Sequence, residues 1–99
     1  MRVYRTLYRY IDLDQIQSIT EPHRDESACG MYFTFYVTLM FQEKPLRISL
    51  PVEMTIGNDY KGTYKTETIN KVFREVTEAH EDLLNAWKGI TVTVTDITK

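Results

Sequence analysis

A chain of 99 residues can build one hydrophobic core but not two, and its 42% hydrophobic and 26% charged residues exclude disorder over most of its length. Twelve basic and fourteen acidic side chains give a net charge of −2, which argues against non-specific binding to nucleic acid or to a membrane surface. The single cysteine excludes an internal disulfide framework, and no apolar run resembles a signal peptide or a membrane span. We therefore expect one cytoplasmic domain over residues 1–99.

The first thirty residues predict two strands and a loop. The segment from Val3 to Ile11 is rich in tyrosine and bulky residues and predicts a strand. A turn is expected over residues 11–16, where two aspartates can bond to nearby backbone, and a short strand over 16–20. Residues 21–30 are polar, contain Pro22 and Gly30 and lack an apolar period, so we expect a loop there.

The clearest pattern is the alternation from Met31 to Phe41. It resumes over residues 46–52 after a polar turn at 42–45, so the two runs predict an antiparallel hairpin. One side of the first run carries the apolar residues Met31, Phe33, Phe35, Val37, Leu39 and Phe41. The other side carries Tyr32, Thr34, Tyr36, Thr38 and Met40.

A long amphipathic helix follows a second loop at residues 53–65. Its apolar stripe runs from Ile69 to Trp87, which predicts a helix from Thr66 to Lys88, with Thr66 or Thr68 as its cap and Gly89 as its left-handed stop. A closing strand is expected over residues 90–95. The order of elements predicts an α+β fold, with an antiparallel sheet of four to five strands and the helix on one face.

Few side chains offer catalytic or metal chemistry. His23 and Cys29 could form a nucleophile and base or two metal ligands, but structural zinc needs four ligands and the chain has one Cys and two His. His80 on the helix stripe could titrate near neutral pH at an interface. Alternatively, it could lie at the edge of the core, with one ring nitrogen hydrogen-bonded to backbone or water. The acidic helix residues are interpreted as a solvated face; they are Glu75, Glu78, Glu81 and Asp82. We expect no enzyme activity, no cofactor and no metal.

Two stretches are candidates for partner binding. The tyrosines of the central strand would point outward if the helix covers the phenylalanines, and tyrosine offers a large rigid surface with a polar end. The first strand alternates arginine with tyrosine. We rank a solvated sheet surface as the first interpretation of this stretch, a protein interface as the second and nucleic-acid binding as the third. The candidate residues are Tyr4, Tyr8, Tyr32, Tyr36, Arg5 and Arg9. We expect a protein partner, with a homodimer as one form of it.

The loop from Gly57 to Thr63 has the spacing of a phosphate-binding loop. Thr63 stands where such a loop needs a lysine, so only a weaker feature is left: Lys61, Lys65 and the helix N-terminus could together favour an anion. The alternative function is therefore binding of nucleic acid or a phosphorylated ligand through Arg5, Arg9, Lys61 and Lys65.

The run from Tyr10 to Ile19 (YIDLDQIQSI), followed by an alternating hairpin and a helix, resembles a pattern found in small uncharacterised bacterial and bacteriophage proteins. In those proteins, a segment with aspartates and spaced isoleucines leads into a sheet closed by one helix. The resemblance implies a small accessory or regulatory protein without a cofactor. Such proteins act by binding, in some cases to inhibit a host or defence complex.

Overall fold

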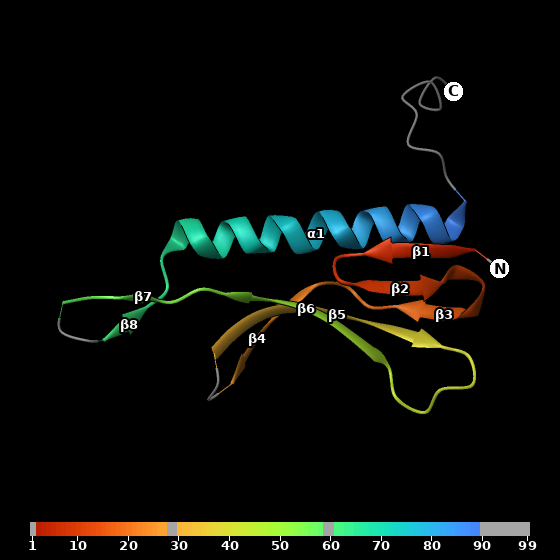
Figure 1. The fold of residues 1–99 in the computed structure, drawn as a ribbon, viewed down its shortest axis with the longest axis horizontal. Helices are drawn as coiled ribbons and strands as arrows, with labels where there is room; N and C mark the ends of the chain where they lie inside the picture. The colour runs from red at the N-terminus through yellow and green to blue at the C-terminus, as the bar shows by residue number, and fades with distance from the viewer. Residues whose placement is uncertain (1, 28–29, 59–60, 90–99) are drawn as a thin grey trace, which may run out of the picture.

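The structure, a computed structural model, describes residues 2–27, 30–58 and 61–89, so the closing strand expected over residues 90–95 lies outside the described residues. Eight strands, one short 3-10 helix (η1) and one α-helix follow one another within these ranges (Figure 1). Their bounds are β1 (Val3–Thr6), β2 (Arg9–Asp12), η1 (Leu13–Gln15), β3 (Ile16–Ile19), β4 (His23–Ser27), β5 (Gly30–Leu39), β6 (Leu46–Val52), β7 (Thr55–Ile56), β8 (Gly62–Thr63) and α1 (Thr66–Lys88).

β5 is the centre of the main sheet. It pairs with β6 along one side and with β3 and β4 in succession along the other, and every pairing is antiparallel. The register of the β5–β6 hairpin places Phe33 opposite Leu50 and Phe35 opposite Ile48. The expected α+β fold, with its antiparallel sheet and its hairpin at residues 31–52, is confirmed.

The helix α1 covers one face of this sheet and contacts both β5 and β6 (Figure 1). The β1–β2 hairpin lies beside the C-terminal half of α1 and adds the buried side chains of Thr6 and Ile11 to the interior. Burial of these apolar side chains supplies the main stabilisation of the fold. The buried apolar residues are Ile11, Leu13, Ile16, Met31, Phe33, Phe35, Val37, Ile48, Val52, Val72, Val76 and Leu83.

The loop expected at residues 53–65 contains the short antiparallel hairpin β7–β8. Three further expectations for the strands are wrong. The single strand expected from Val3 to Ile11 is a hairpin, β1–β2, with Leu7 in the turn at φ +50°. No glycine, asparagine or proline marks that turn, so the sequence carries no sign of it. The loop expected at residues 21–30 contains β4, whose polar residues all pair with β5. It is an edge strand with largely solvent-accessible side chains, so it needs no apolar period.

Phe41 is the third correction. The alternation placed it with the buried phenylalanines, but β5 ends at Leu39 and the Phe41 side chain is 96% exposed. Its φ of +65° lies in the left-handed region, so the chain has left the extended geometry that the alternation requires.

The turn at residues 11–16 and the C-terminal end of α1 follow from local chemistry. The Asp12 carboxylate accepts a hydrogen bond from the Asp14 amide at 3.1 Å and caps η1. Gly89 ends α1 at φ +76° and donates its N–H to the Ala86 carbonyl, as expected. The N-terminal cap differs, because Lys65 occupies that position without a side-chain cap hydrogen bond, so the expected cap by a threonine is wrong.

Arg2 joins the start of the chain to η1 through an ion pair and to the end of α1 through a hydrogen bond. Arg2 Nε lies 2.7 Å from Asp14 Oδ1, and Arg2 Nη1 lies 3.5 Å from the Ala86 carbonyl oxygen. The hydrogen bond from Arg2 lowers the pKa of Asp14 below its ordinary value of 3.8. A cation also interacts favourably with the negative end of the helix dipole.

We expect Asp14→Asn to lower the melting temperature at pH 7, and we expect this difference to shrink as the pH falls below 3.8. The pKa of Asp14 is lower in the folded state, so its stabilisation is present above the ordinary pKa and is lost as the pH falls through the folded value. Melting curves of both proteins at several pH values give the measurement. A difference in melting temperature that does not shrink at any acid pH would contradict a role for the Asp14 charge. Glu43→Asn, in the exposed β5–β6 turn, is the control.

Candidate interface on the outer face of the sheet

The face of the sheet opposite α1 carries a set of aromatic and polar side chains. Residues opposite one another in antiparallel strands point to the same face, so the register assigns this set directly. Asp25 and Pro51 lie beside Tyr32, His23 and Ser49 lie beside Thr34, and Arg47 lies beside Tyr36. We call this surface the tyrosine face; it comprises His23, Asp25, Tyr32, Thr34, Tyr36, Arg47, Ser49 and Pro51.

The side chains of the tyrosine face hold one another in place. The His23 ring stacks on the Tyr36 ring at a centroid distance of 5.9 Å and an interplanar angle of 22°. The Arg47 guanidinium lies 5.2 Å from the centroid of the Tyr32 ring and 3.5 Å from Asp25 Oδ2. Arg47 therefore links β6 to β4 across the central strand. Both tyrosines are half-buried, which leaves each ring partly open to a partner.

Thr34 occupies the middle of this face between the two tyrosines. Its side chain is completely buried, and its Oγ1 has no hydrogen-bond partner among the described residues. We expect Thr34→Val to raise the free energy of unfolding by about 1 kcal/mol, because the isosteric change removes a buried unsatisfied hydroxyl. Urea unfolding measures the difference. A loss of stability would show instead that the hydroxyl has a partner in solution. Thr38→Val, on a half-buried residue of the same strand, is the control.

Tyr4 and Arg5 lie away from the tyrosine face. Both lie on β1 and line a hollow against α1 together with Glu75, Glu78 and Asp82. Burial, followed by the charge of Asp82, raises the pKa of the Tyr4 hydroxyl. Arg5 therefore lies beside the acidic face of the helix. Tyr4 and Arg5 belong to a different surface from Tyr32 and Tyr36.

Tyr8 and Arg9 lie near the tip of the β1–β2 hairpin, next to β6. The Ser49 amide donates to the Tyr8 hydroxyl oxygen at 3.4 Å, and the Arg9 guanidinium lies 5.4 Å from the Tyr8 ring centroid. Burial raises the pKa of Tyr8, but hydrogen bonds from Ser49 and Arg9 outweigh it, so the net pKa falls below 10.0. The Tyr8 ring is 55% exposed and borders the tyrosine face at Ser49.

The two lysines expected to contact an anion lie at the other end of the molecule, by the β7–β8 hairpin (Figure 1). Lys61 accepts a backbone hydrogen bond from Gly57 at 3.0 Å, and Lys65 directly precedes α1, whose first turn carries the acidic Glu67. Glu75 in the hollow around Arg5 is ten residues further along the helix than Lys65, or about 15 Å. The structure does not bring the four basic candidates together.

The remaining candidates for chemistry lie apart from one another. His23 belongs to the tyrosine face, Cys29 lies outside the described residues, and His80 is buried, with its ring edge-on to Phe35 at 5.2 Å. In the part of the chain that the structure describes, no three histidine, cysteine or acidic side chains gather in a way that could hold a metal ion. The one described helix lacks the combination of length and apolar character needed to cross a membrane.

Comparisons with family models, with curated proteins and with solved structures find no match for this chain. The site is therefore defined by its own geometry. Sequence reasoning missed His23, Asp25 and Arg47 as members of the tyrosine face, because two of them fall in the segment expected to be a loop. The alternation of Arg47 with the apolar residues of β6 was the one available signal for its side of the sheet.

Proposed function

We propose that this protein is a non-catalytic binding module whose tyrosine face docks against a protein partner. The observation that carries the proposal is the arrangement of the two layers: α1 packs on one face of the sheet, and half-buried tyrosines with an arginine occupy the opposite face. Tyrosine and arginine are enriched in protein interfaces and among the residues that dominate binding energy. The proposed biological role is accessory or regulatory, of the kind that the sequence resemblance implies.

Two properties of the tyrosine face favour a protein as the partner. Its side chains are already stacked and paired, so little rotamer freedom remains to be lost on binding. Its arginine is paired with Asp25, so the face offers ring surface and hydroxyl groups in place of a net positive charge. A surface of low net charge with partly exposed aromatic rings suits a partner that is flat, partly apolar and able to accept hydrogen bonds.

We expect Tyr36→Glu to weaken partner binding by at least tenfold, because it places a charge where the proposed interface excludes water. Light scattering at micromolar concentration first establishes whether the partner is a second copy of the chain; if it is, this variant should be monomeric. If the wild type is already monomeric, wild-type and variant baits are compared in quantitative affinity capture from the native host.

Tyr10→Glu is the matched control, since Tyr10 is 73% exposed on β2 of the separate hairpin. A protein captured equally by the wild type and Tyr10→Glu, but not by Tyr36→Glu, supports the proposal. Circular dichroism must show that both variants are folded. A folded Tyr36→Glu protein that keeps its oligomeric state and its captured partner would refute binding through this face.

The alternative function, binding of nucleic acid or a phosphorylated ligand, has less support because Arg5 lies far along α1 from Lys65. It makes a different prediction, a steep fall in affinity with added salt. A gel-shift titration with oligonucleotides at low and high salt separates the two functions.

A further inference from the structure

The two edges of the main sheet differ in how they are protected. At the β6 edge, Ser49 donates its N–H to the Tyr8 hydroxyl oxygen at 3.4 Å, and Pro51 has no N–H to offer. At the opposite edge, no strand among the described residues pairs with the outer side of β4. An edge of this kind presents backbone donors and acceptors that can pair with a further strand.

The register shows which backbone groups of β4 are directed outward. Thr20 donates its N–H to the Tyr36 carbonyl at 2.9 Å, so the backbone of Tyr36 is directed to the β3–β4 side of β5. Backbone groups alternate in direction along an antiparallel strand, so the partner of Asp25 on β5 is directed to the same side. Asp25 therefore has its backbone directed to β5, whereas Arg24 and Glu26 direct their N–H and C=O groups away from it.

The charged side chains of β4 are self-complementary in one antiparallel register. If β4 pairs with the same strand of a second copy about a two-fold axis at Asp25, Arg24 lies opposite the partner's Glu26, and the reverse pair forms by symmetry. A shift of two residues would place Arg24 opposite Arg24 or Glu26 opposite Glu26, and like charges at such positions are destabilising. Within one copy, Arg24 Nε lies 3.4 Å from Glu26 Oε2, so charges of alternating sign would surround the axis.

The same register has one unfavourable contact, because it brings the Asp25 carboxylates of the two copies together on the tyrosine face. Each carboxylate has Arg47 Nη2 of its own chain at 3.5 Å from Oδ2. A counter-charge at that distance offsets part of the repulsion between the carboxylates. Arg47 therefore makes the register with Asp25 at the axis tolerable.

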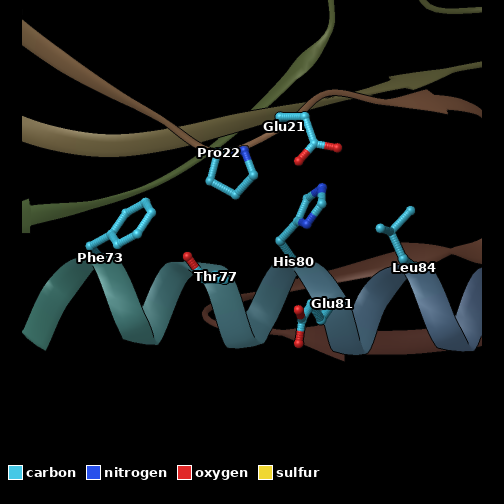
Figure 2. Close-up of a pocket in the computed structure, with 7 residues that line it drawn as sticks. All are labelled: Glu21, Pro22, Phe73, Thr77, His80, Glu81 and Leu84. Atoms are coloured by element: carbon cyan, nitrogen blue, oxygen red, sulfur yellow. The ribbon is translucent and has the colours of Figure 1, made fainter. Parts of the chain in front are cut away.

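The helix side of the sheet has room for a second copy. α1 lies over β5 and β6, and the bend before β4 lies against the helix with Pro22 facing it (Figure 2). A cavity of about 300 Å³ beside His80 separates this bend from α1. Strands are about 4.8 Å apart, so the helices of two copies paired through β4 would lie about 19 Å apart, more than one helix diameter.

An apolar surface lies next to the β4 edge on the same side. Phe33 and Phe73 line a shallow hollow together with Arg24, and the Phe73 side chain is 45% exposed. The Phe33 and Phe73 rings are 5.1 Å apart between centroids, so the hollow is continuous with the core. A second copy at the edge would cover part of this surface and add apolar burial to the backbone pairing.

We propose that the protein forms a two-fold dimer in which the β4 strands pair antiparallel, with Asp25 at the axis. The outward backbone groups of Arg24 and Glu26 supply the hydrogen bonds, their side chains set the register, and the hollow at Phe73 contributes burial. The two tyrosine faces then lie on one side of a continuous sheet, which doubles the surface open to a protein partner. The inference does not rest on the proposed function, because the pairing uses the sheet edge and not the tyrosine rings.

Sedimentation velocity at low salt, from about 5 to 500 μM protein, measures the self-association, and we expect the dimer to dominate above about 100 μM. Arg24→Glu places like charges opposite each other on both sides of the axis, so it should weaken the dimer about tenfold or more. Glu26→Arg should do the same. A mixture of these two variants should form a heterodimer, because every opposing pair then has opposite signs.

Lys44→Glu and Glu43→Lys are the matched controls, since they change the net charge by the same amounts in the exposed β5–β6 turn. Each should dimerise like the wild type, and circular dichroism must show that all variants are folded. A wild type that stays monomeric at about 500 μM would overturn the proposal, because the affinity would then be weaker than millimolar. So would a mixture of the β4 variants that stays monomeric, or an equal loss of the dimer in the controls.

A cross-linking experiment tests the register. In a Cys29→Ser background, Asp25→Cys should form a disulfide-linked dimer on mild oxidation, because facing residues at the axis have Cα atoms about 4.5 Å apart. Ser27→Cys in the same background is the control. In this register the two copies of residue 27 lie about 14 Å apart, beyond the reach of a disulfide. Failure of Asp25→Cys to cross-link, or equal cross-linking of both variants, would overturn the pairing centred on Asp25.

Tyr36→Glu separates this dimer from docking through the tyrosine face. A dimer that Tyr36→Glu keeps and Arg24→Glu loses assigns self-association to β4, and affinity capture with Tyr36→Glu as bait then tests the proposed function on its own. A dimer that Tyr36→Glu loses and Arg24→Glu keeps would overturn pairing through β4 and support the tyrosine face. Each proposal can therefore fail without the other.

Discussion

Replacement of Phe35 by alanine is expected to lower the free energy of unfolding by about 3–5 kcal/mol. The Phe35 side chain is completely buried in the middle of β5, where it faces Ile48 across the hairpin and the His80 ring at 5.2 Å. Truncation loses the transfer free energy of the ring and leaves a cavity that neighbours from two elements cannot fill. A small domain has about 5–15 kcal/mol of stability in total, so much of it would be lost.

Urea unfolding followed by circular dichroism measures this loss, and a thermal melt should show a fall in melting temperature of about 15 °C or more. Phe41→Ala is the matched control, because it removes the same ring from a side chain that is 96% exposed. We expect that variant to change stability by less than about 0.5 kcal/mol. Similar losses for Phe35 and Phe41 would contradict the end of β5 at Leu39 and the burial that follows from it.

Replacement of Leu83 by alanine is expected to cost about 2–5 kcal/mol. Leu83 is completely buried on α1, together with Val76, and both belong to the core that joins the helix to the sheet. Alanine and leucine have similar helix propensities, so the effect comes from packing and not from the helix itself. The loss should therefore appear as a lower midpoint of cooperative unfolding.

Leu84→Ala tests the rotational position of the helix. A step of one residue turns the side chain by about 100°, so Leu84 lies half-buried at the border of the core. We expect this variant to cost about 1 kcal/mol, well below the cost of Leu83→Ala. Equal costs for the two leucines would mean that α1 docks on the sheet with a different side from the one described.

The elements with strong local signals could be predicted from the sequence. Strict alternation over residues 31–39 and 46–52 gave both strands of the hairpin, and the apolar stripe with Gly89 behind it gave the bounds of α1. These patterns work because a strand and a helix bury every second residue and every third or fourth residue. The same alternation predicted that Tyr32 and Tyr36 share a side, since two residues of one strand an even number apart always do.

The elements without local signals could not be predicted. β4 is polar because its edge position leaves most of its side chains accessible, and its strand geometry comes from pairing with β5. The β1–β2 turn has Leu7 at a positive φ, a conformation that leucine rarely adopts, and a contact between Tyr8 and Ser49 ties its tip to β6. Such long-range contacts have no counterpart in the local sequence.

The sequence by itself therefore determined the class of fold, the hairpin, the helix and the two sides of β5, because each depends on residues close together in the chain. Only the tertiary structure decided which side chains surround the tyrosines. His23 and Arg47 are 24 residues apart, yet the register of three strands places both on the tyrosine face. The cavity beside His80 was likewise decided by tertiary structure, since it requires Glu21 and α1 to meet across more than fifty residues of chain. Pairing between distant segments is set by the packing of the whole core, which no local pattern encodes.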